Sequence, residues 1–256
     1  MRDQRYQVKY LSSLKEEKRR HFIRSRMRKG QKIVKILGEE TCLKRAVVLD
    51  LGCSIGIISD VLARRVNSVV GVDIDDDAIR TAARLHRMEN CSFILADGGH
   101  LPFKSNCFDV VICNQVLEHV PNPTLLISEI YRTVKDHGLV YFAVGNRFVL
   151  FEPHYGLPFL SWLPGKVADL YLRITKRGMH YYERLPTYWS LKKILQPFTI
   201  KDKTVHVVKN PRRYFISDEI PSWLIPILKR LPTTFLRLLL PLFPSWIFIL
   251  RKDHKN

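Results

Sequence analysis

Long hydrophobic runs are missing from this sequence of 256 residues. The longest, "LLLPLFPSWIFIL" from Leu238 to Leu250, is interrupted by Pro241 and Pro244. A helix that spans a membrane needs about 20 apolar residues, so this run is too short and too broken to form one. The first residues, "MRDQRYQVKYLSSLKEEKRR", also lack the apolar segment of a secretory signal peptide. Neither a membrane span nor secretion is therefore expected.

Cysteine is scarce, and its five residues show no sign of pairing. Their number is odd, and no two of them have the C-x-x-C spacing. Most lie within apolar stretches, where a free thiol packs like a small apolar side chain. Neither a disulfide framework nor a zinc-binding cysteine cluster is expected, and this cysteine usage favours the reducing cytoplasm.

Acidic residues are few relative to basic ones. The sequence contains 24 Asp and Glu against 42 Lys and Arg, which leaves a formal net charge of +18. Such an excess attracts anionic partners, namely nucleic acids, phospholipid headgroups or phosphorylated substrates. The charge alone does not distinguish among these partners, and it says nothing about the fold.

Residues 1–45 read as a basic helical region. Within them, residues 9–37 place apolar side chains among many charges, and Gly38 is a suitable stop. The run "KEEKRRHFIRSRMRKG" is the most basic local stretch. Its cations either form a solvated helix face or bind an anion, and the sequence leaves both interpretations open.

Residues 46–145 alternate between short apolar segments and amphipathic ones. The expected strands are "AVVLDL", "SVVGVDI", "CSFILAD", "CFDVVICN" and "GLVYFAVG". The expected helices are "GIISDVLARRV", "DDDAIRTAARLHRM", whose cap would be Asp75 or Asp76, and "NPTLLISEIYRTV". Strands that alternate with helices form a mostly parallel sheet covered on both faces. The sequence therefore predicts an α/β fold with a doubly wound, Rossmann-like sheet.

Two insertions follow this alternating region. Residues 146–186 are rich in aromatic residues, Pro and Gly, and are expected to cover the edge of the sheet as a cap over the substrate. Residues 187–256 resume the sheet with the helix "TYWSLKKILQPF" and the strands "DKTVHVV" and "SWIFILRK". They contain a second insertion, 209–245, which is both basic and apolar. This insertion either lies in a bilayer interface, with its cations on anionic headgroups, or packs on the protein's own sheet.

The first four expected strands end in polar residues. These residues are Asp50, Asp73, Asp97 and Asn114. In an open parallel sheet, ligands bind outside the carboxyl ends of the strands, so the four side chains are expected to line one pocket. A carboxylate at the position of Asp73 is suited to bind both hydroxyls of a ribose.

A turn of small residues follows the first strand. Gly52, Ser54 and Gly56 in "LDLGCSIG" match neither the dinucleotide motif G-x-G-x-x-G nor the phosphate loop. Bare backbone beside the carboxylate of Asp50 suits a ligand that approaches the main chain closely. An ordinary tight turn between a strand and a helix is the alternative.

The chain resembles the class I S-adenosylmethionine-dependent methyltransferases, in the group that includes ubiquinone and menaquinone biosynthesis methyltransferases. The resemblance rests on "VVLDLGCSIG", "VVGVDID", "ILADGGHLPFKSNCFDVVICNQVLEHVPNP" and "EIYRTVKDHGLVYFAV", which span roughly residues 46–145. It implies a seven-stranded sheet whose last strand is antiparallel, a place that "SWIFILRK" could take. It also implies a methyltransferase core over 46–145 with S-adenosylmethionine as its cofactor.

The resemblance further implies which residues bind this cofactor. The loop after the first strand would contact the methionine part, and the second strand's carboxylate would hold the ribose. The third strand's end would face the adenine, and the fourth would lie beside the sulfonium. The residues concerned are Asp50, Gly52, Cys53, Ser54, Gly56, Asp73, Ile74, Asp97, Gly98, Asn114 and Gln115.

One residue departs from the family pattern. The family loop usually reads Asp-x-Gly-x-Gly-x-Gly, and Ser54 stands in place of the middle glycine. Serine is small, so weaker preorganisation rather than loss of binding is expected. A positive φ at Ser54 would put that expectation in doubt.

Two histidines are candidates for the acceptor side of the reaction. His119 in "LEHVPNP" follows the fourth strand, and His154 in "EPHYGLP" lies in the first insertion. Either could act as a general base for an oxygen or nitrogen acceptor, and a structural role is the alternative for each. No His, Cys or Asp cluster has metal-ligand spacing along the sequence, so no metal is expected.

Three functions are compatible with these observations. The first is methylation of a small-molecule or lipid-linked acceptor at the cytoplasmic membrane face, with peripheral binding through 209–245. The second is an RNA methyltransferase, suggested by the net charge, although "CNQV" is not the Asn/Asp-Pro-Pro-aromatic tetrad and no RNA-binding module is recognisable. The third is a module that binds the cofactor without catalysis. The sequence favours the first.

Overall fold

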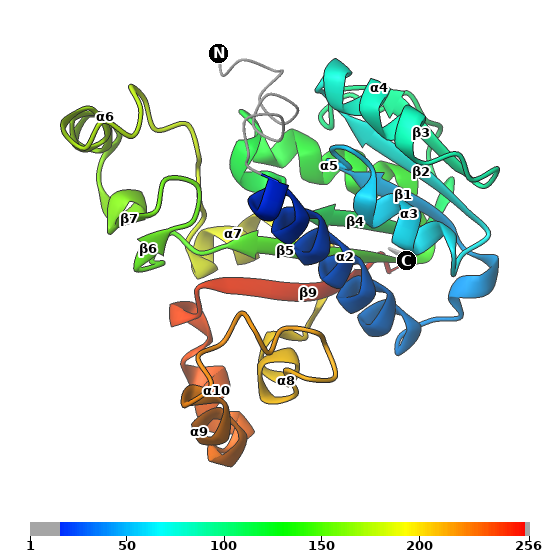
Figure 1. Cartoon of the computed structure of the whole chain (residues 1–256). Helices are drawn as coiled ribbons and strands as arrows, with labels where there is room; N and C mark the ends of the chain where they lie inside the picture. The colour runs from blue at the N-terminus through cyan, green and yellow to red at the C-terminus, as the bar shows by residue number, and fades with distance from the viewer. Residues whose placement is uncertain (1–15, 254–256) are drawn as a thin grey trace.

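A seven-stranded sheet forms the centre of the molecule (Figure 1), in the order β3-β2-β1-β4-β5-β9-β8. The computed structural model describes residues 16–253, so residues 9–15 of the expected N-terminal helix lie outside the described residues. The strands are β1 (Val47–Leu51), β2 (Ser68–Asp73), β3 (Cys91–Leu95), β4 (Phe108–Asn114), β5 (Val134–Gly145), β8 (Thr199–Asp202) and β9 (Ser245–Arg251). Strands β1 to β5 pair in parallel, and β9 runs antiparallel to both β5 and β8. The expected α/β sheet with an antiparallel last strand is confirmed.

Helices cover both faces of this sheet. The helices are α2 (Glu16–Gly38), α3 (Ile57–Ala63), α4 (Asp76–Leu85), α5 (Pro123–Thr133) and α7 (Tyr188–Ile194). Successive side chains of a strand point to opposite faces. In β4, Val110 and Ile112 accordingly pack in one apolar cluster with α2 and α3. Val111 and Cys113 pack in another with α5 and α7. The sheet is therefore buried on both sides, as a doubly wound fold requires.

Several helix ends lie where the sequence places them. Helix α4 begins after Asp75, whose Oδ1 accepts a hydrogen bond of 3.1 Å from the backbone N–H of Ala78. This bond confirms the predicted cap. Helix α2 ends at Gly38, the predicted stop.

The expected strand "DKTVHVV" is wrong. Strand β8 ends at Asp202, and the following residues form the helix α8 (Thr204–Lys209). The side chain of Asp202 accepts a hydrogen bond of 3.0 Å from the backbone N–H of Thr204 and so stabilises the first turn. The β-branched residues suggested a strand, but Val205 and Val207 are buried within a helix, so tertiary packing outweighs their local propensity.

The two insertions project from the sheet in different places, the first at the left of Figure 1 and the second at the bottom, below β9. Residues 146–186 form a lobe with β6 (Phe151–Glu152), β7 (Leu157–Pro158) and α6 (Gly165–Ile174), around a small apolar core of its own. The second insertion carries α9 (Leu224–Arg230) and α10 (Thr233–Leu238). Helix α9 has no buried residue. Among residues 16–253, no helix combines the length and the apolar character that crossing a membrane requires.

Candidate active site

A buried carboxylate lies in β1, just before the turn of small residues. Asp50 is only 2% exposed, and its Oδ2 accepts a hydrogen bond of 2.6 Å from the hydroxyl of Ser59 in α3. Burial raises the pKa of Asp50 to about 7, because a charged carboxylate is poorly solvated there. The nearby Asp73 adds to this rise, whereas the Ser59 hydrogen bond and the charge of Arg26 oppose it.

The turn after β1 is held by backbone hydrogen bonds. The N–H groups of Gly52 and Cys53 donate to the carbonyl of Val72 in β2, at 2.8 and 3.0 Å. Gly52 has a φ of +71°, and a Cβ added there would lie 2.5 Å from Cγ2 of Val116. Glycine is therefore required at this position, both for its conformation and for the space.

Ser54 has a positive φ, the conformation that puts the expected tolerance of serine in doubt. Its φ is +53°, in the left-handed region. For a residue other than glycine, this conformation is less stable than the right-handed one by roughly 1–2 kcal/mol. Its backbone N–H donates a hydrogen bond of 2.7 Å to Oδ2 of Asp73, which opposes this cost.

Asp73 connects the loop after β1 to the start of α4. Besides Ser54, its carboxylate accepts a hydrogen bond of 3.0 Å from the backbone N–H of Asp75. Burial raises its pKa, while these backbone hydrogen bonds oppose the rise. A carboxylate offers about four lone-pair positions, so the ribose hydroxyls expected here could still be accepted. The neighbouring Ile74 is half exposed at the same edge.

The end of β3 forms a local turn. Asp97 is exposed, and its Oδ1 accepts a hydrogen bond of 2.8 Å from the N–H of Gly99. A Cβ added to Gly98 would lie 2.9 Å from Cδ1 of Leu126, so the backbone here approaches α5 closely. This geometry explains the residue types without a ligand, and contact of Asp97 and Gly98 with the adenine stays a prediction.

The end of β4 presents an amide with unused hydrogen-bonding capacity. The Nδ2 atom of Asn114 is buried and has no hydrogen-bond partner within the described part of the chain. A buried donor without a partner costs free energy, so such an atom points to a missing acceptor. Gln115, which follows, has a φ of +59° and donates its backbone N–H to Ala143 at 2.8 Å.

Helix α2 contributes two residues that the sequence reasoning did not single out. Phe22 and Arg26 line a narrow pocket together with Asp50, the loop from Gly52 to Ile55, and Asn114. Burial lowers the pKa of Arg26, and the charges of Asp50 and Asp73 counteract this effect. The basic run of α2 was a visible signal, but nothing in the sequence shows which of its cations faces the pocket. Because these side chains narrow the pocket, a ligand as large as S-adenosylmethionine requires them to move aside.

The residues around this pocket fit S-adenosylmethionine. Its carboxylate matches the cation of Arg26 and the unpartnered amide of Asn114. Its ammonium and sulfonium cations match the carboxylate of Asp50, and its ribose hydroxyls match that of Asp73. When bound, this cofactor supplies an electrophilic methyl group, so the chain needs only to bind and align the two reactants.

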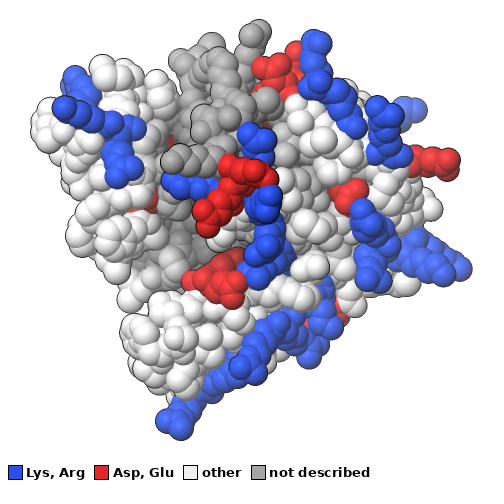
Figure 2. Space-filling view, viewed as in Figure 1, with Lys and Arg blue, Asp and Glu red and all other residues white. Residues whose placement is uncertain are grey.

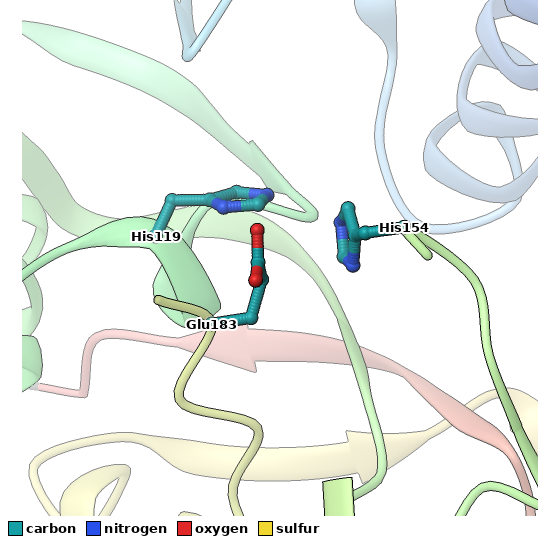
Figure 3. A group of neighbouring side chains, drawn as sticks. All are labelled: His119, His154 and Glu183. Atoms are coloured by element: carbon teal, nitrogen blue, oxygen red, sulfur yellow. The ribbon is translucent and has the colours of Figure 1, made fainter. Parts of the chain in front are cut away.

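His119 and His154 lie side by side, although they come from distant segments. His119 ends a short helical turn after β4, and His154 lies between β6 and β7. Their ring centroids are 5.0 Å apart, and the carboxylate of Glu183 points toward both rings (Figure 3). Burial lowers the pKa of His154, but a hydrogen bond to Glu152 and the surrounding carboxylates outweigh this effect and raise the pKa overall.

Glu118 and Glu183 were not among the candidates from the sequence. Both are buried, and burial raises the pKa of Glu118 to about 7. The backbone N–H of Arg184 donates a hydrogen bond of 2.8 Å to the carbonyl of Glu118, which fixes the segment of Glu183 against the core. In the sequence, the position of Glu118 next to His119 in "LEHV" could have drawn attention to it. Glu183 is far from both histidines in the sequence and reaches the cluster only through the tertiary fold.

Relatives of known activity match the chain over most of its length. A family model described as a methyltransferase domain matches residues 49–142. The ubiquinone biosynthesis O-methyltransferase of Pseudomonas entomophila is 36% identical over 197 residues, which cover 72% of this chain and 78% of that enzyme. The enzyme of the same name from Idiomarina loihiensis is 30% identical over 181 residues, or 67% of this chain and 69% of the relative. The match to the enzyme of the same name from Nitrosomonas europaea covers 58% of that enzyme.

Solved structures share the fold. The phosphoethanolamine N-methyltransferase 1 of Haemonchus contortus superposes with a TM-score of 0.55 at 15% identity, over 90% of this chain and 44% of that one. The [4+2]-cyclase SpnF gives a TM-score of 0.54 at 17% identity, over 88% and 81% of the two chains. Such low identities show the fold alone. The sequence relatives show more: this chain is an enzyme of the class I S-adenosylmethionine-dependent methyltransferases, with S-adenosylmethionine as its cofactor.

Proposed function

We propose that the enzyme methylates an oxygen atom of a quinone-related aromatic acceptor with an apolar tail, at an anionic membrane surface. The relatives named ubiquinone biosynthesis O-methyltransferase support the acceptor class. The single observation that carries the membrane part is the exposure of apolar side chains among cations on the second insertion.

The exposed apolar side chains gather on α9, α10 and their flanking loops. Leu238 is 79% exposed, and the other members are Trp223, Ile227, Phe235 and Leu242. We call these five residues the apolar patch. Exposed leucine and tryptophan are costly in water but stable in the headgroup region of a bilayer. The apolar patch is therefore suited to partial insertion into lipid.

Cations lie next to the apolar patch. Figure 2 shows a row of Lys and Arg side chains along the part of the molecule that carries the second insertion. Lys209, Lys229 and Arg237 line a hollow between α8, α9 and α10. A hollow with this charge fits the phosphate of an anionic headgroup, and each cation near such a surface contributes about 1 kcal/mol.

The lobe of residues 146–186 is the part of the enzyme that we propose binds the acceptor. It brings His154 next to His119, beyond the end of β4 where Asn114 lies. Its exposed aromatic and aliphatic side chains include Phe151, Phe159 and Trp162. Such side chains would suit a ring with an apolar tail, and a substrate cap formed by residues 146–186 stays part of this proposal.

The acceptor is tested by incubating the purified protein with isotopically labelled S-adenosylmethionine. Hydroxylated quinone precursors with polyprenyl tails, and total RNA, are offered as separate acceptors, and labelled products are detected by mass spectrometry. We expect label in the quinone precursor, its loss in Asp73→Ala, and its retention in the control Asp76→Ala, because the partly exposed Asp76 pairs with Arg80 within α4. Label in RNA alone would show that the acceptor proposal is wrong.

The membrane surface is tested separately by sedimentation with vesicles. We expect binding to vesicles that contain phosphatidylglycerol and weaker binding to pure phosphatidylcholine. Burial of one leucine contributes about 1.5–3 kcal/mol, so Leu238→Asp is expected to weaken binding by roughly 10- to 100-fold. The matched control is Leu85→Asp, since Leu85 is 62% exposed at the end of α4, outside the apolar patch. Equal binding of the two variants would contradict the proposed surface.

A further inference from the structure

Three side chains with metal-binding atoms meet beside the acceptor side of the active site. One ligand atom each of His119, His154 and Glu183 lies within 4.8 Å of the others. The three residues come from the turn after β4, the turn between β6 and β7, and the segment that precedes α7. Figure 3 shows the Glu183 carboxylate directed at the space between the two imidazole rings.

His154 is held in the orientation that a metal ligand needs. Its Nδ1 lies 2.6 Å from Oε1 of Glu152, a residue with no exposed surface. The other oxygen of Glu152 accepts hydrogen bonds of 2.8 Å from the backbone N–H groups of His154 and Tyr155. Metal-binding histidines almost always donate their second ring nitrogen to a carboxylate or a carbonyl in this way. The arrangement leaves Nε2 of His154 for a ligand bond.

The surroundings are electrostatically suited to a cation. Glu118 is fully buried, and neither of its carboxylate oxygens has a hydrogen-bond partner within residues 16–253. It lies close enough to His154 and Glu183 for their charges to interact. Buried charges are normally paired or bound to a metal, because an isolated one is costly. A divalent cation among these residues would compensate the buried carboxylate of Glu118.

We propose that His119, His154 and Glu183 bind a divalent transition-metal ion. Two imidazoles and one carboxylate form a ligand set used for Zn²⁺ at catalytic sites, which keep a further position for water or substrate. Ligand atoms around a tetrahedral Zn²⁺ lie roughly 3.4 Å apart, as follows from bonds of about 2.1 Å. Small side-chain rotations therefore suffice to close the site. The proposed metal site is independent of the identity of the acceptor.

A metal ion at this site would connect three segments of the chain. The ion would join the core, through His119, to the lobe of residues 146–186, through His154. Glu183 would attach the segment that returns the chain from the lobe to α7. Metal binding is therefore expected to stabilise the lobe against the sheet, and to raise the unfolding temperature with metal concentration.

The first experiment measures metal binding without any reaction. The whole protein is treated with a chelator and dialysed, and ZnCl₂ is titrated by calorimetry while unfolding is followed in parallel. Co²⁺ serves as a spectroscopic probe, because its visible bands report low coordination numbers. We expect a single Zn²⁺ per chain and a higher unfolding temperature. Absence of Zn²⁺ binding in the folded protein would overturn the proposal, whatever the methylation assays show.

Variants distinguish this site from other histidines. His154→Ala and Glu183→Gln are expected to weaken Zn²⁺ binding by at least 100-fold and to abolish the Co²⁺ bands. Glu152→Gln, which alters only the orienting contact, is expected to weaken it by roughly 10- to 100-fold. The control is His180→Ala, because His180 lies in the same lobe but pairs with Asp169. Circular dichroism of the metal-free variants confirms folding, and a folded His154→Ala that binds Zn²⁺ like His180→Ala would refute the site.

Discussion

Replacing Asp50 by Asn changes a buried acid into an amide of the same shape. The Asn carbonyl can still accept the hydroxyl of Ser59, which donates to Asp50 at 2.6 Å. The substitution therefore removes the charge and leaves the packing of β1 against α3 largely unchanged. Its effect on stability is expected to depend strongly on pH, because only the wild-type side chain titrates.

The magnitude follows from the pKa of Asp50, which burial raises from 3.8 to about 7. Well below pH 3.8 the group is protonated in both states and contributes no difference. Between these two pKa values the folded protein keeps a proton that the unfolded chain releases, so the free energy of unfolding falls as pH rises. Each pKa unit corresponds to about 1.4 kcal/mol, which gives a total loss of about 4 kcal/mol that is complete only well above pH 7. About 3 kcal/mol of this loss falls between pH 5 and 8.5.

The assay is urea unfolding of the cofactor-free protein at several pH values and constant ionic strength. The stability of Asp50→Asn relative to wild type should increase by about 3 kcal/mol between pH 5 and 8.5. The control is Asp109→Asn. Burial of Asp109 is outweighed by its hydrogen bonds, the first to Lys135, so that its pKa is lowered and it does not titrate in this range. Parallel pH profiles of wild type and Asp50→Asn would show that the buried carboxylate is not penalised, and the reasoning would fail.

Three further substitutions test the loop and the core. Ser54→Gly should raise the free energy of urea unfolding by up to about 1 kcal/mol, because relief of the left-handed strain, roughly 1–2 kcal/mol, exceeds the added freedom of the unfolded chain; unchanged or lower stability would contradict this. Gly52→Ala should lower the free energy of urea unfolding by about 1–3 kcal/mol through its φ and the contact with Val116, and wild-type stability would refute the clash. Trp246→Phe should lower the free energy of unfolding by about 2–4 kcal/mol in the same assay, because it leaves a cavity and removes the hydrogen bond from Nε1 to the carbonyl of Leu240. A decrease below about 1 kcal/mol would mean that the surrounding side chains repack.

The parts of the fold that sequence alone predicts are those with strong local signals. The alternating segments of residues 46–145 became the expected strands and helices because each carries its own periodicity and its own stop. Asp75 caps α4 as predicted, since a capping bond spans only a few residues. The row of polar strand ends could also be anticipated, because carboxyl ends of parallel strands meet at one edge of a sheet.

The remaining features depend on contacts between distant segments. Val205 and Val207 have the residue types of a strand, and only their burial beside β9 explains the helix. Arg26 is one of many cations in α2, and its place in the pocket follows from how that helix crosses the sheet. Glu183 joins His119 and His154 only because the chain passes through the lobe and returns. Spacing along the sequence contains no information on such a cluster.

The position of β9 between β5 and β8 affects how the chain can be made. The ribosome releases β5 long before β9, so the nascent chain exposes an unpaired apolar strand edge throughout synthesis of both insertions. Such an edge readily pairs with other chains and promotes aggregation. The sheet closes only when residues 245–251 emerge, which makes translation of the second half the period in which the chain most needs a chaperone.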